Sequence, residues 1–263
     1  MDLKLKGKKA LVTGSTAGIG FAIAQGLAQE GASVVINGRT DSRVQEALQQ
    51  LRSSTSGDLS GITADLGSAE GVQGLTAQLA AVDILINNVG IFQPKPFPSI
   101  RDEDWLQTFN VNVMSGVRLS RAYLPGMKEH GWGRVIFISS ESALNTPAEM
   151  IDYGVSKTAQ LALARGLAET MAGTGVTVNS VLPGPTRSEG VEGFIKELSK
   201  GQNIDEAAFE KEFFKTMRPG SLIKRFARPE EIAAMVVYLC GEPASATTGA
   251  AVRVDGGVVH TIA

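Results

Sequence analysis

Short apolar runs rich in β-branched residues alternate along this chain with longer stretches in which apolar side chains recur at helical spacing. The short runs predict seven strands, at 9–13, 33–37, 59–64, 82–87, 134–139, 176–181 and 251–255. The longer stretches predict helices at 18–30, 41–53, 68–80, 103–130, 152–172 and 229–240. This alternation predicts an α/β fold, a doubly wound parallel sheet with helices on both faces. Such sheets bind ligands outside the carboxyl ends of their strands, so functional residues are expected there.

The alternation of strands and helices continues through 263 residues without a long linker or repeat, which predicts a single domain over 1–263. One segment, 188–219, departs from it and is interpreted as an inserted substrate lid. Its apolar residues are spaced as amphipathic turns: Phe194, Ile195, Leu198, Phe209, Phe213, Phe214 and Met217. They favour a hydrophobic substrate, although they would equally suit a cover for the end of the sheet or a subunit contact.

Composition excludes several classes of function. With 25 Lys and Arg against 27 Asp and Glu, the formal net charge is -2, and no summed positive field favours nucleic acid as a partner. One cysteine, Cys240, and two distant histidines leave no zinc-ligand cluster and no internal disulfide, so no metal site is expected. The apolar run at 10–12 is too short for a signal sequence or a membrane span, so we expect a cytoplasmic chain that does not associate with membranes.

A glycine-rich turn follows the first predicted strand and opens directly into the first predicted helix. Its residues are Gly14, Ser15, Thr16, Gly18, Ile19 and Gly20. Glycines let the backbone approach a pyrophosphate at the positive end of a helix, as in the Rossmann dinucleotide-binding fold. Tight turns that bind nothing also use glycine. The strand before the turn, the helix after it and a second strand ending roughly twenty residues later favour the Rossmann interpretation.

Residues at the end of the second predicted strand are expected to distinguish the ribose of NAD from the 2′-phosphorylated ribose of NADP. A site that prefers NAD would place an acid there, whereas this chain has Gly38 followed by Arg39. Because a guanidinium binds a phosphate through two hydrogen bonds, NADP(H) is the predicted cofactor, with Ser15 and Thr40 as further hydroxyl contacts. The alternative is that Arg39 is an ordinary solvated surface arginine.

Tyr153 and Lys157 stand four residues apart on a predicted helix and share one of its faces. Ser140 ends the fifth predicted strand, thirteen residues before the tyrosine. A phenol has a pKa near ~10, so a tyrosine that transfers protons near neutral pH needs an adjacent positive charge, which Lys157 offers. Ser140 could instead be a strand-end cap. A serine hydrolase is disfavoured, because neither His130 nor His260 falls where a base would be needed.

These motifs resemble the classical short-chain dehydrogenase/reductase family along essentially the whole chain. The glycine spacing Gly14-x-x-x-Gly18-x-Gly20 fits, and the further matches are Asp65-Leu66, Asn87 to Gly90, Asn112, Ser140, Tyr153-x-x-x-Lys157 and Pro183 to Thr186. The resemblance implies that Tyr153 donates a proton and that Ser140 polarises a carbonyl oxygen. It implies that Lys157 binds the nicotinamide ribose, and that Asn112 holds a water. Further cofactor contacts are implied for Asp65, Leu66, Asn88, Gly90, Pro183, Gly184 and Thr186.

Three functions stay open on this resemblance. The first is an NADP(H)-dependent carbonyl reductase or alcohol dehydrogenase, and the second is a 3-oxoacyl-(acyl carrier protein) reductase of fatty-acid synthesis. The third, a non-catalytic NADP-binding regulator, is disfavoured by the complete set of catalytic residues. The length of segment 188–219 disfavours the second, and we expect that segment to close over the nicotinamide. The resemblance also implies a homotetramer in which the helices at 103–130 and 152–172 pair across a two-fold axis.

Overall fold

Seven parallel strands organise the part of the chain that the structure, a computed structural model, describes, namely residues 1–187 and 205–262. They pair in the order β3-β2-β1-β4-β5-β6-β7. Their bounds are β1 (Lys9–Val12), β2 (Ser33–Gly38), β3 (Leu59–Thr63), β4 (Ile84–Asn87), β5 (Gly133–Ile138), β6 (Val176–Pro183) and β7 (Ala251–Val254). The predicted α/β fold with a seven-stranded parallel sheet is confirmed.

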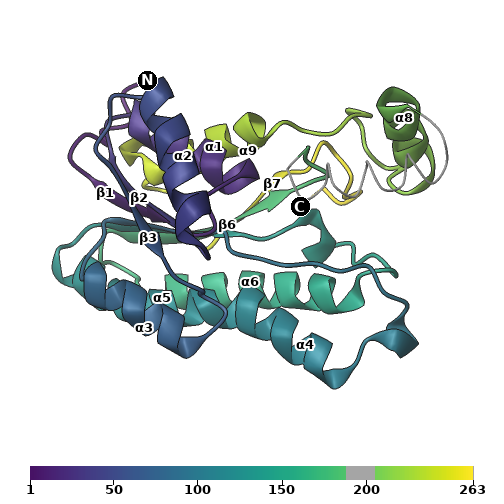
Figure 1. Ribbon diagram of the computed structural model, residues 1–263, viewed down its shortest axis with the longest axis horizontal. Helices are drawn as coiled ribbons and strands as arrows, with labels where there is room; N and C mark the ends of the chain where they lie inside the picture. The colour runs from purple at the N-terminus through teal and green to yellow at the C-terminus, as the bar shows by residue number, and fades with distance from the viewer. Residues whose placement is uncertain (188–204, 263) are drawn as a thin grey trace.

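Helices cover both faces of the sheet (Figure 1). One layer holds α1 (Gly18–Gln29), α2 (Asp41–Ser54) and α9 (Pro229–Cys240); the other holds α3 (Ala69–Gln78), α4 (Asp102–Phe109), α5 (Ser115–Glu129) and α6 (Ile151–Thr170). Successive strand residues enter opposite cores: Ile84 and Ile86 of β4 pack in the first and Leu85 in the second. Because both faces are buried, the strands read as continuous apolar runs. No helix among the described residues is long and apolar enough to cross a membrane.

The order of the strands places the functional crevice. Strands β1 to β3 extend the sheet in one direction, and β4 then returns to pair with the free side of β1. A doubly wound sheet binds its ligand where this direction reverses, outside the carboxyl ends of the strands. The turn after β1 and the residues after β4 therefore meet at one edge of the sheet.

The helix predicted at 103–130 is not continuous. A π-helical turn, Asn110–Met114, separates α4 from α5. Within it the side chain of Asn112 turns to the backbone of Ile91, accepting a hydrogen bond from its N at 2.8 Å and donating one to its O at 2.9 Å. A π turn inserts one extra residue into a helix and is frequent at functional sites, which apolar periodicity does not reveal.

The predicted lid at 188–219 is described only in its second part, because 188–204 lie outside the described residues. The second part contains α8 (Glu206–Thr216), which stands at one end of the molecule and begins at Asp205, whose Oδ1 accepts a hydrogen bond from Ala208 N at 2.7 Å. Phe209 and Phe214 of this helix form a small core with Phe226, which follows in the chain, and Phe213 packs against it. Part of the apolar pattern is therefore structural.

Candidate active site

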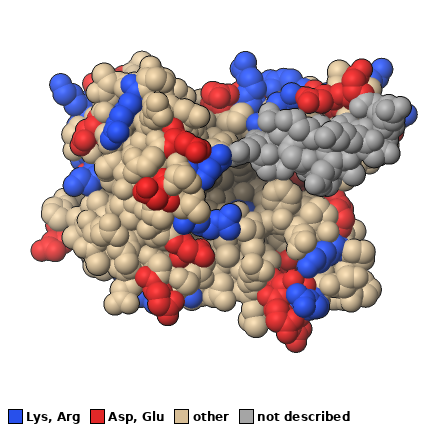
Figure 2. Space-filling view, in the orientation of Figure 1, with Lys and Arg blue, Asp and Glu red and all other residues tan. Residues whose placement is uncertain are grey.

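A cavity of about 570 Å³ opens beyond the carboxyl ends of β4, β5 and β6. Figure 2 shows a hollow near the middle of this face, between the two helical layers, with Lys and Arg side chains along its rim. Three predicted catalytic residues, Ser140, Tyr153 and Lys157, lie on its wall. Predicted cofactor residues from three separate segments also line it: Ile19, Asn88, Gly90, Pro183, Gly184 and Thr186.

The glycine turn after β1 adopts a shape that other residues would not hold. Gly14 and Gly18 have φ angles of 59° and 57°, in the left-handed region that favours glycine. A Cβ on Gly20 would lie 2.5 Å from Asn88 Nδ2. That amide donates hydrogen bonds to Thr13 O and Gly14 O, both at 2.9 Å. Asn88, which follows β4, therefore braces the turn that follows β1.

The start of α1 fits a dinucleotide phosphate. No side chain caps this helix at Ala17, and no acidic residue occupies its first turn. The first backbone N–H groups of a helix lack intrahelical partners and lie at its positive end, where an anion is stabilised. The glycine turn gives such an anion close access to the backbone, so the residues present fit the pyrophosphate of a nicotinamide dinucleotide.

The Ser15 hydroxyl, for which a cofactor contact is predicted, forms hydrogen bonds inside the protein. Ser15 is fully buried, and its Oγ donates to Val12 O at 2.6 Å and accepts from Asn37 N at 3.0 Å. Its own N–H donates to Asn37 O. The side chain thus ties the end of β1 to β2, and its one hydroxyl hydrogen is used inside the protein.

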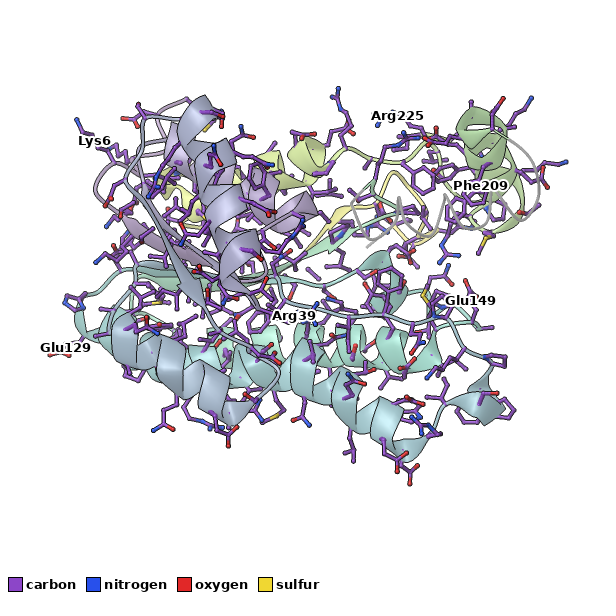
Figure 3. The ribbon with its side chains drawn as sticks, in the orientation of Figure 1. Lys6, Arg39, Glu129, Glu149, Phe209 and Arg225 are labelled. Atoms are coloured by element: carbon purple, nitrogen blue, oxygen red, sulfur yellow. The ribbon has the colours of Figure 1, made fainter. Side chains whose placement is uncertain are left out.

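Arg39 and Thr40 are exposed at the end of β2, and Figure 3 shows Arg39 between the two helical layers. No described residue forms an ion pair or hydrogen bond with the Arg39 side chain. Thr40 Oγ1 lies 3.5 Å from Ser42 Oγ. A Cβ at Gly38 would lie 2.5 Å from Thr16 Cγ2, so an acidic side chain at this position would require Thr16 to move.

The other predicted cofactor residues differ in what they can offer. Asp65 is exposed, with Oδ1 accepting a hydrogen bond from Gly67 N at 3.0 Å. The Leu66 side chain is buried in the core, so only its backbone is available to a ligand. Thr186 is also buried, and its Oγ1 donates to Gly184 O at 2.9 Å, which holds the turn after β6.

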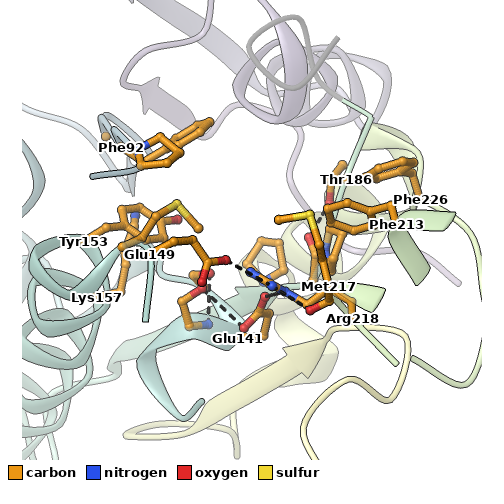
Figure 4. Close-up of a pocket in the computed structure, with 18 of the residues that line it drawn as sticks. Phe92, Glu141, Glu149, Tyr153, Lys157, Thr186, Phe213, Met217, Arg218 and Phe226 are labelled. Carbon is orange, nitrogen blue, oxygen red and sulfur yellow. Dashed lines mark hydrogen bonds and ion pairs between the residues drawn. The ribbon is translucent and has the colours of Figure 1, made fainter. Parts of the chain in front are cut away.

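The three residues of the catalytic wall come from β5 and α6. Ser140, two residues after the end of β5, accepts a hydrogen bond from Ser142 N at 3.1 Å, and its hydroxyl acts to lower the pKa of Tyr153. Lys157 Nζ donates to the carbonyl of Ile138 at 2.8 Å and lies 5.5 Å from the centre of the Tyr153 ring. Figure 4 shows Tyr153 and Lys157 side by side at the cavity.

Burial dominates the protonation of this pair. It raises the pKa of Tyr153 to about 12, with a further increase from the Glu141 carboxylate, although the hydrogen bond with Ser140 opposes the shift. Burial also lowers the pKa of Lys157 to about 7. The positive charge that Lys157 was expected to offer Tyr153 is thus itself disfavoured by burial. A lysine whose own charged form is disfavoured stabilises a neighbouring phenolate less than a solvated ammonium would.

Residues 8–198 match the family of short chain dehydrogenases. The chain belongs to this family. The uncharacterized oxidoreductase YvaG of Bacillus subtilis (strain 168) is 48% identical over 263 residues, covering 100% of both chains. The 3-oxoacyl-[acyl-carrier-protein] reductase FabG of Aquifex aeolicus (strain VF5) is 31% identical, covering 98% of this chain and 100% of its own. L-sorbose reductase from Gluconobacter frateurii, complexed with NADPH and L-sorbose, is 33% identical with a TM-score of 0.94, covering 100% of both chains.

The resemblance predicted from the motifs is thereby confirmed, and the chain is an oxidoreductase of the short-chain dehydrogenase family. The sequence did not lead us to predict one set of hydrogen bonds in this dehydrogenase, those of Gln160. Gln160 accepts a hydrogen bond from Lys157 Nζ at 3.3 Å and donates one to the backbone carbonyl of Asn112 at 2.5 Å. The Asn112 amide itself is occupied by the Ile91 backbone and by Ser156 Oγ at 2.9 Å. Gln160 stands three residues after Lys157 on α6, and that spacing was the available signal.

Three charged residues of the dehydrogenase cavity had also been missed: Glu141, Glu149 and Arg218. Arg218, just after α8, places Nε 3.2 Å from Glu141 Oε1 and Nη1 3.5 Å from Glu149 Oε1. Burial raises the pKa of Glu141, and the charge of Arg218 opposes that shift. No local pattern connects Arg218 with acids 69 and 77 residues earlier in the chain.

Proposed function

We propose that the chain is an NADPH-dependent reductase of ketones or aldehydes, which oxidises the corresponding alcohol in the reverse direction, with Tyr153 as the proton donor. One observation carries the proposal. Ser140, Tyr153 and Lys157 share the wall of a cavity with Ile19 of the glycine turn and with Asn88, which contacts that turn. A carbonyl group in this cavity would meet a proton donor, a hydrogen-bond donor and the bound dinucleotide together.

The roles of the side chains follow from their positions. When bound, the reduced nicotinamide supplies the hydride for the carbonyl carbon. The Ser140 hydroxyl donates a hydrogen bond to the carbonyl oxygen and stabilises the negative charge that develops there. Tyr153, with a pKa of about 12, is protonated at neutral pH, which is the state that a proton donor needs, and it transfers its proton to that oxygen. Lys157 and Gln160 connect this wall with the Asn112 carbonyl by hydrogen bonds, which supports a route for proton resupply.

The choice of NADPH rests on the end of β2. Arg39 is exposed there without a partner among the described residues, and the space at Gly38 is filled by Thr16. A guanidinium stabilises a 2′-phosphate, whereas an acid would be needed to bind the free ribose hydroxyls of NAD. The NADPH complex of the related L-sorbose reductase supports the same choice.

A 3-oxoacyl-(acyl carrier protein) reductase is the second candidate, supported by the 31% identity with FabG of Aquifex aeolicus. Oxidation of NADPH by the full chain, measured over ketones, aldehydes, quinones and acetoacetyl thioesters, separates the two. Highest catalytic efficiency with a free ketone or aldehyde supports the first proposal. Preference for the thioester favours the second, and tight NADPH binding without any turnover would favour a regulator.

The proton donor is tested by Tyr153→Phe. We expect kcat to fall by about 10²- to 10⁴-fold, the usual contribution of a general acid, while the Kd for NADPH stays within about threefold. Tyr238→Phe, which removes the hydroxyl of a partly exposed tyrosine on α9, is the matched control and should leave both unchanged. Substantial turnover by Tyr153→Phe would assign the proton to another group.

A further inference from the structure

Three charged residues of the cavity, Glu141, Glu149 and Arg218, form one cluster beside the catalytic wall (Figure 4). Glu141 follows Ser140 directly in the chain and is only 4% exposed. The Arg218 side chain, 12% exposed, lies between Glu141 and Glu149, and all three residues line the cavity. When all are ionised, two carboxylates face one guanidinium, so the cluster carries an excess of negative charge.

A purely structural role does not account for this arrangement. Desolvating ions is costly, and apolar packing would tether α8 to β5 at least as well as a buried ion pair. Phe213, Phe214 and Phe226 already supply such packing beneath α8. The cluster instead keeps capacity for further hydrogen bonds, because the Glu149 side chain is 41% exposed and Arg218 Nη2 donates to no described residue.

The chemistry of the cluster selects a class of ligand. Carboxylate oxygens accept hydrogen bonds from hydroxyl groups, and the guanidinium donates to hydroxyl or carbonyl oxygens. The excess negative charge of the cluster disfavours an anionic ligand, and Glu212, a third acid on the described wall of this cavity, adds to it. The site therefore suits a neutral molecule that carries several hydroxyl groups.

The position of Glu141 indicates where those hydroxyls lie. It adjoins Ser140 in the chain and lines the same cavity as Tyr153, whose pKa its charge helps to raise. A ligand whose carbonyl oxygen meets Ser140 and Tyr153 would thus place its neighbouring carbons against Glu141. The aromatic ring of Phe213 and the side chain of Met217 stand on the opposite wall and can contact the C–H groups of the same ligand.

We propose that Glu141, Arg218 and Glu149 form the specificity site for a neutral, polyhydroxylated ketone, binding the hydroxyls next to the carbonyl and rejecting carboxylate-bearing ketones. This inference rests on the proposed reductase activity. It assigns substrate choice to a cluster that is separate from the proton-transferring residues.

Three four-carbon ketones test the inference on the full chain with NADPH: erythrulose, which is neutral and hydroxylated, 2-butanone, which lacks hydroxyls, and acetoacetate, which is anionic. We expect kcat/KM of the wild type to be at least about tenfold higher for erythrulose than for 2-butanone, with acetoacetate the poorest, since each lost hydrogen bond in such a site costs roughly tenfold or more. Equal efficiency with erythrulose and 2-butanone would overturn the inference and leave the reductase activity standing.

Variants then assign the effect to the cluster. Glu141→Gln keeps the side-chain shape, and we expect it to raise KM for erythrulose by about tenfold with little change in kcat, to leave 2-butanone within about threefold, and to improve acetoacetate. Glu149→Gln, at a half-exposed position, should act in the same direction. Glu230→Gln on the exposed start of α9 is the control. Equal losses for all three ketones in the two cluster variants would refute a specificity role. No turnover of any ketone or aldehyde by the wild type would refute the reductase proposal itself.

Discussion

The two ends of the cavity are built in different ways. At the cofactor end, backbone groups and short polar side chains hold each other close to the strands, as when Asn88 donates to two carbonyls of the turn after β1. At the substrate end, long side chains from segments outside the sheet meet across the cavity, as when Arg218 reaches an acid 77 residues earlier. The first end is tied to the sheet and suits a constant ligand. The second can change with little effect on the sheet, which suits a variable substrate.

The largest expected effect tests whether the two ends are stable independently. Phe214 is 2% exposed and packs on Phe213 and Phe226, in a core separate from those on the sheet. Phe214→Ala should destabilise this unit by about 3–5 kcal/mol, so amide hydrogen exchange in α8 should accelerate by at least about a hundredfold. Exchange in α1 should not change. Equal acceleration in both helices would mean that the two ends unfold as one unit.

Phe213→Ala is the companion to that variant. Phe213 lines the cavity, whereas Phe214 does not, so the two phenylalanines of the predicted lid have different roles. Of the two variants, Phe213→Ala should cause the larger loss of catalytic efficiency. Phe214→Ala should cause the larger acceleration of hydrogen exchange in α8. The same ranking in both measurements would contradict this division.

The cofactor end should respond to a single methyl group. A Cβ at Gly20 would lie 2.5 Å from Asn88 Nδ2 and 2.5 Å from Gly14 O, so Gly20→Ala must displace the turn. We expect the Kd for NADPH, measured by fluorescence titration, to rise by about 30- to 100-fold, or roughly 2–3 kcal/mol. Gly74→Ala on α3, where an added Cβ meets nothing within 4 Å, is the control. Unchanged NADPH binding in Gly20→Ala would place the dinucleotide elsewhere.

Lys157 stands between the two ends, and its burial predicts a dependence of stability on pH. Its pKa is about 7 in the folded protein against 10.5 for an ordinary lysine. Between these values the unfolded chain binds a proton that the folded chain does not, so the free energy of unfolding rises with pH, by at most about 1.4 kcal/mol per unit. From pH 7 to pH 9 the wild type should gain about 2 kcal/mol relative to Lys157→Met in urea denaturation. Parallel curves for the two proteins would show that Lys157 is charged when folded, and Lys128→Met, at an exposed position, provides the reference.

The smallest expected effect concerns Arg39, which directly follows β2 at the cofactor end of the cavity. Arg39→Ala should raise the Kd for NADPH by about tenfold, near 1.4 kcal/mol, and leave NADH binding within about twofold. Arg43→Ala, a change at another exposed arginine on the neighbouring helix α2, should alter neither. Equal losses for both cofactors would assign Arg39 a structural role.

The same contrast explains what the sequence could predict. All seven strands were predicted, because a strand buried on both faces consists largely of consecutive apolar residues. The glycine turn and the pairing of Tyr153 with Lys157 could also be predicted, because the turn is contiguous and the two side chains share one helix. The internal hydrogen bonds of the Ser15 hydroxyl were not predicted, because its partners lie on two different strands. The contacts of Arg218 with Glu141 and Glu149 depend on tertiary packing, which no local spacing encodes.

The π-helical turn at Asn110–Met114 has a consequence for how this protein tolerates deletions. Each residue of an α-helix advances the chain by about 100°, so the one extra residue sets the rotation of α4 relative to α5. Removing one residue from the turn would restore a regular helix and rotate α4 by that angle about its axis. Thr108, which now donates to Asp152 Oδ2 at 3.0 Å, would leave α6, and Gln160 would lose the Asn112 carbonyl. The loss of a single codon here would therefore separate α6, the helix that carries Tyr153, from α4. Ser140, Tyr153 and Lys157 would all still be present.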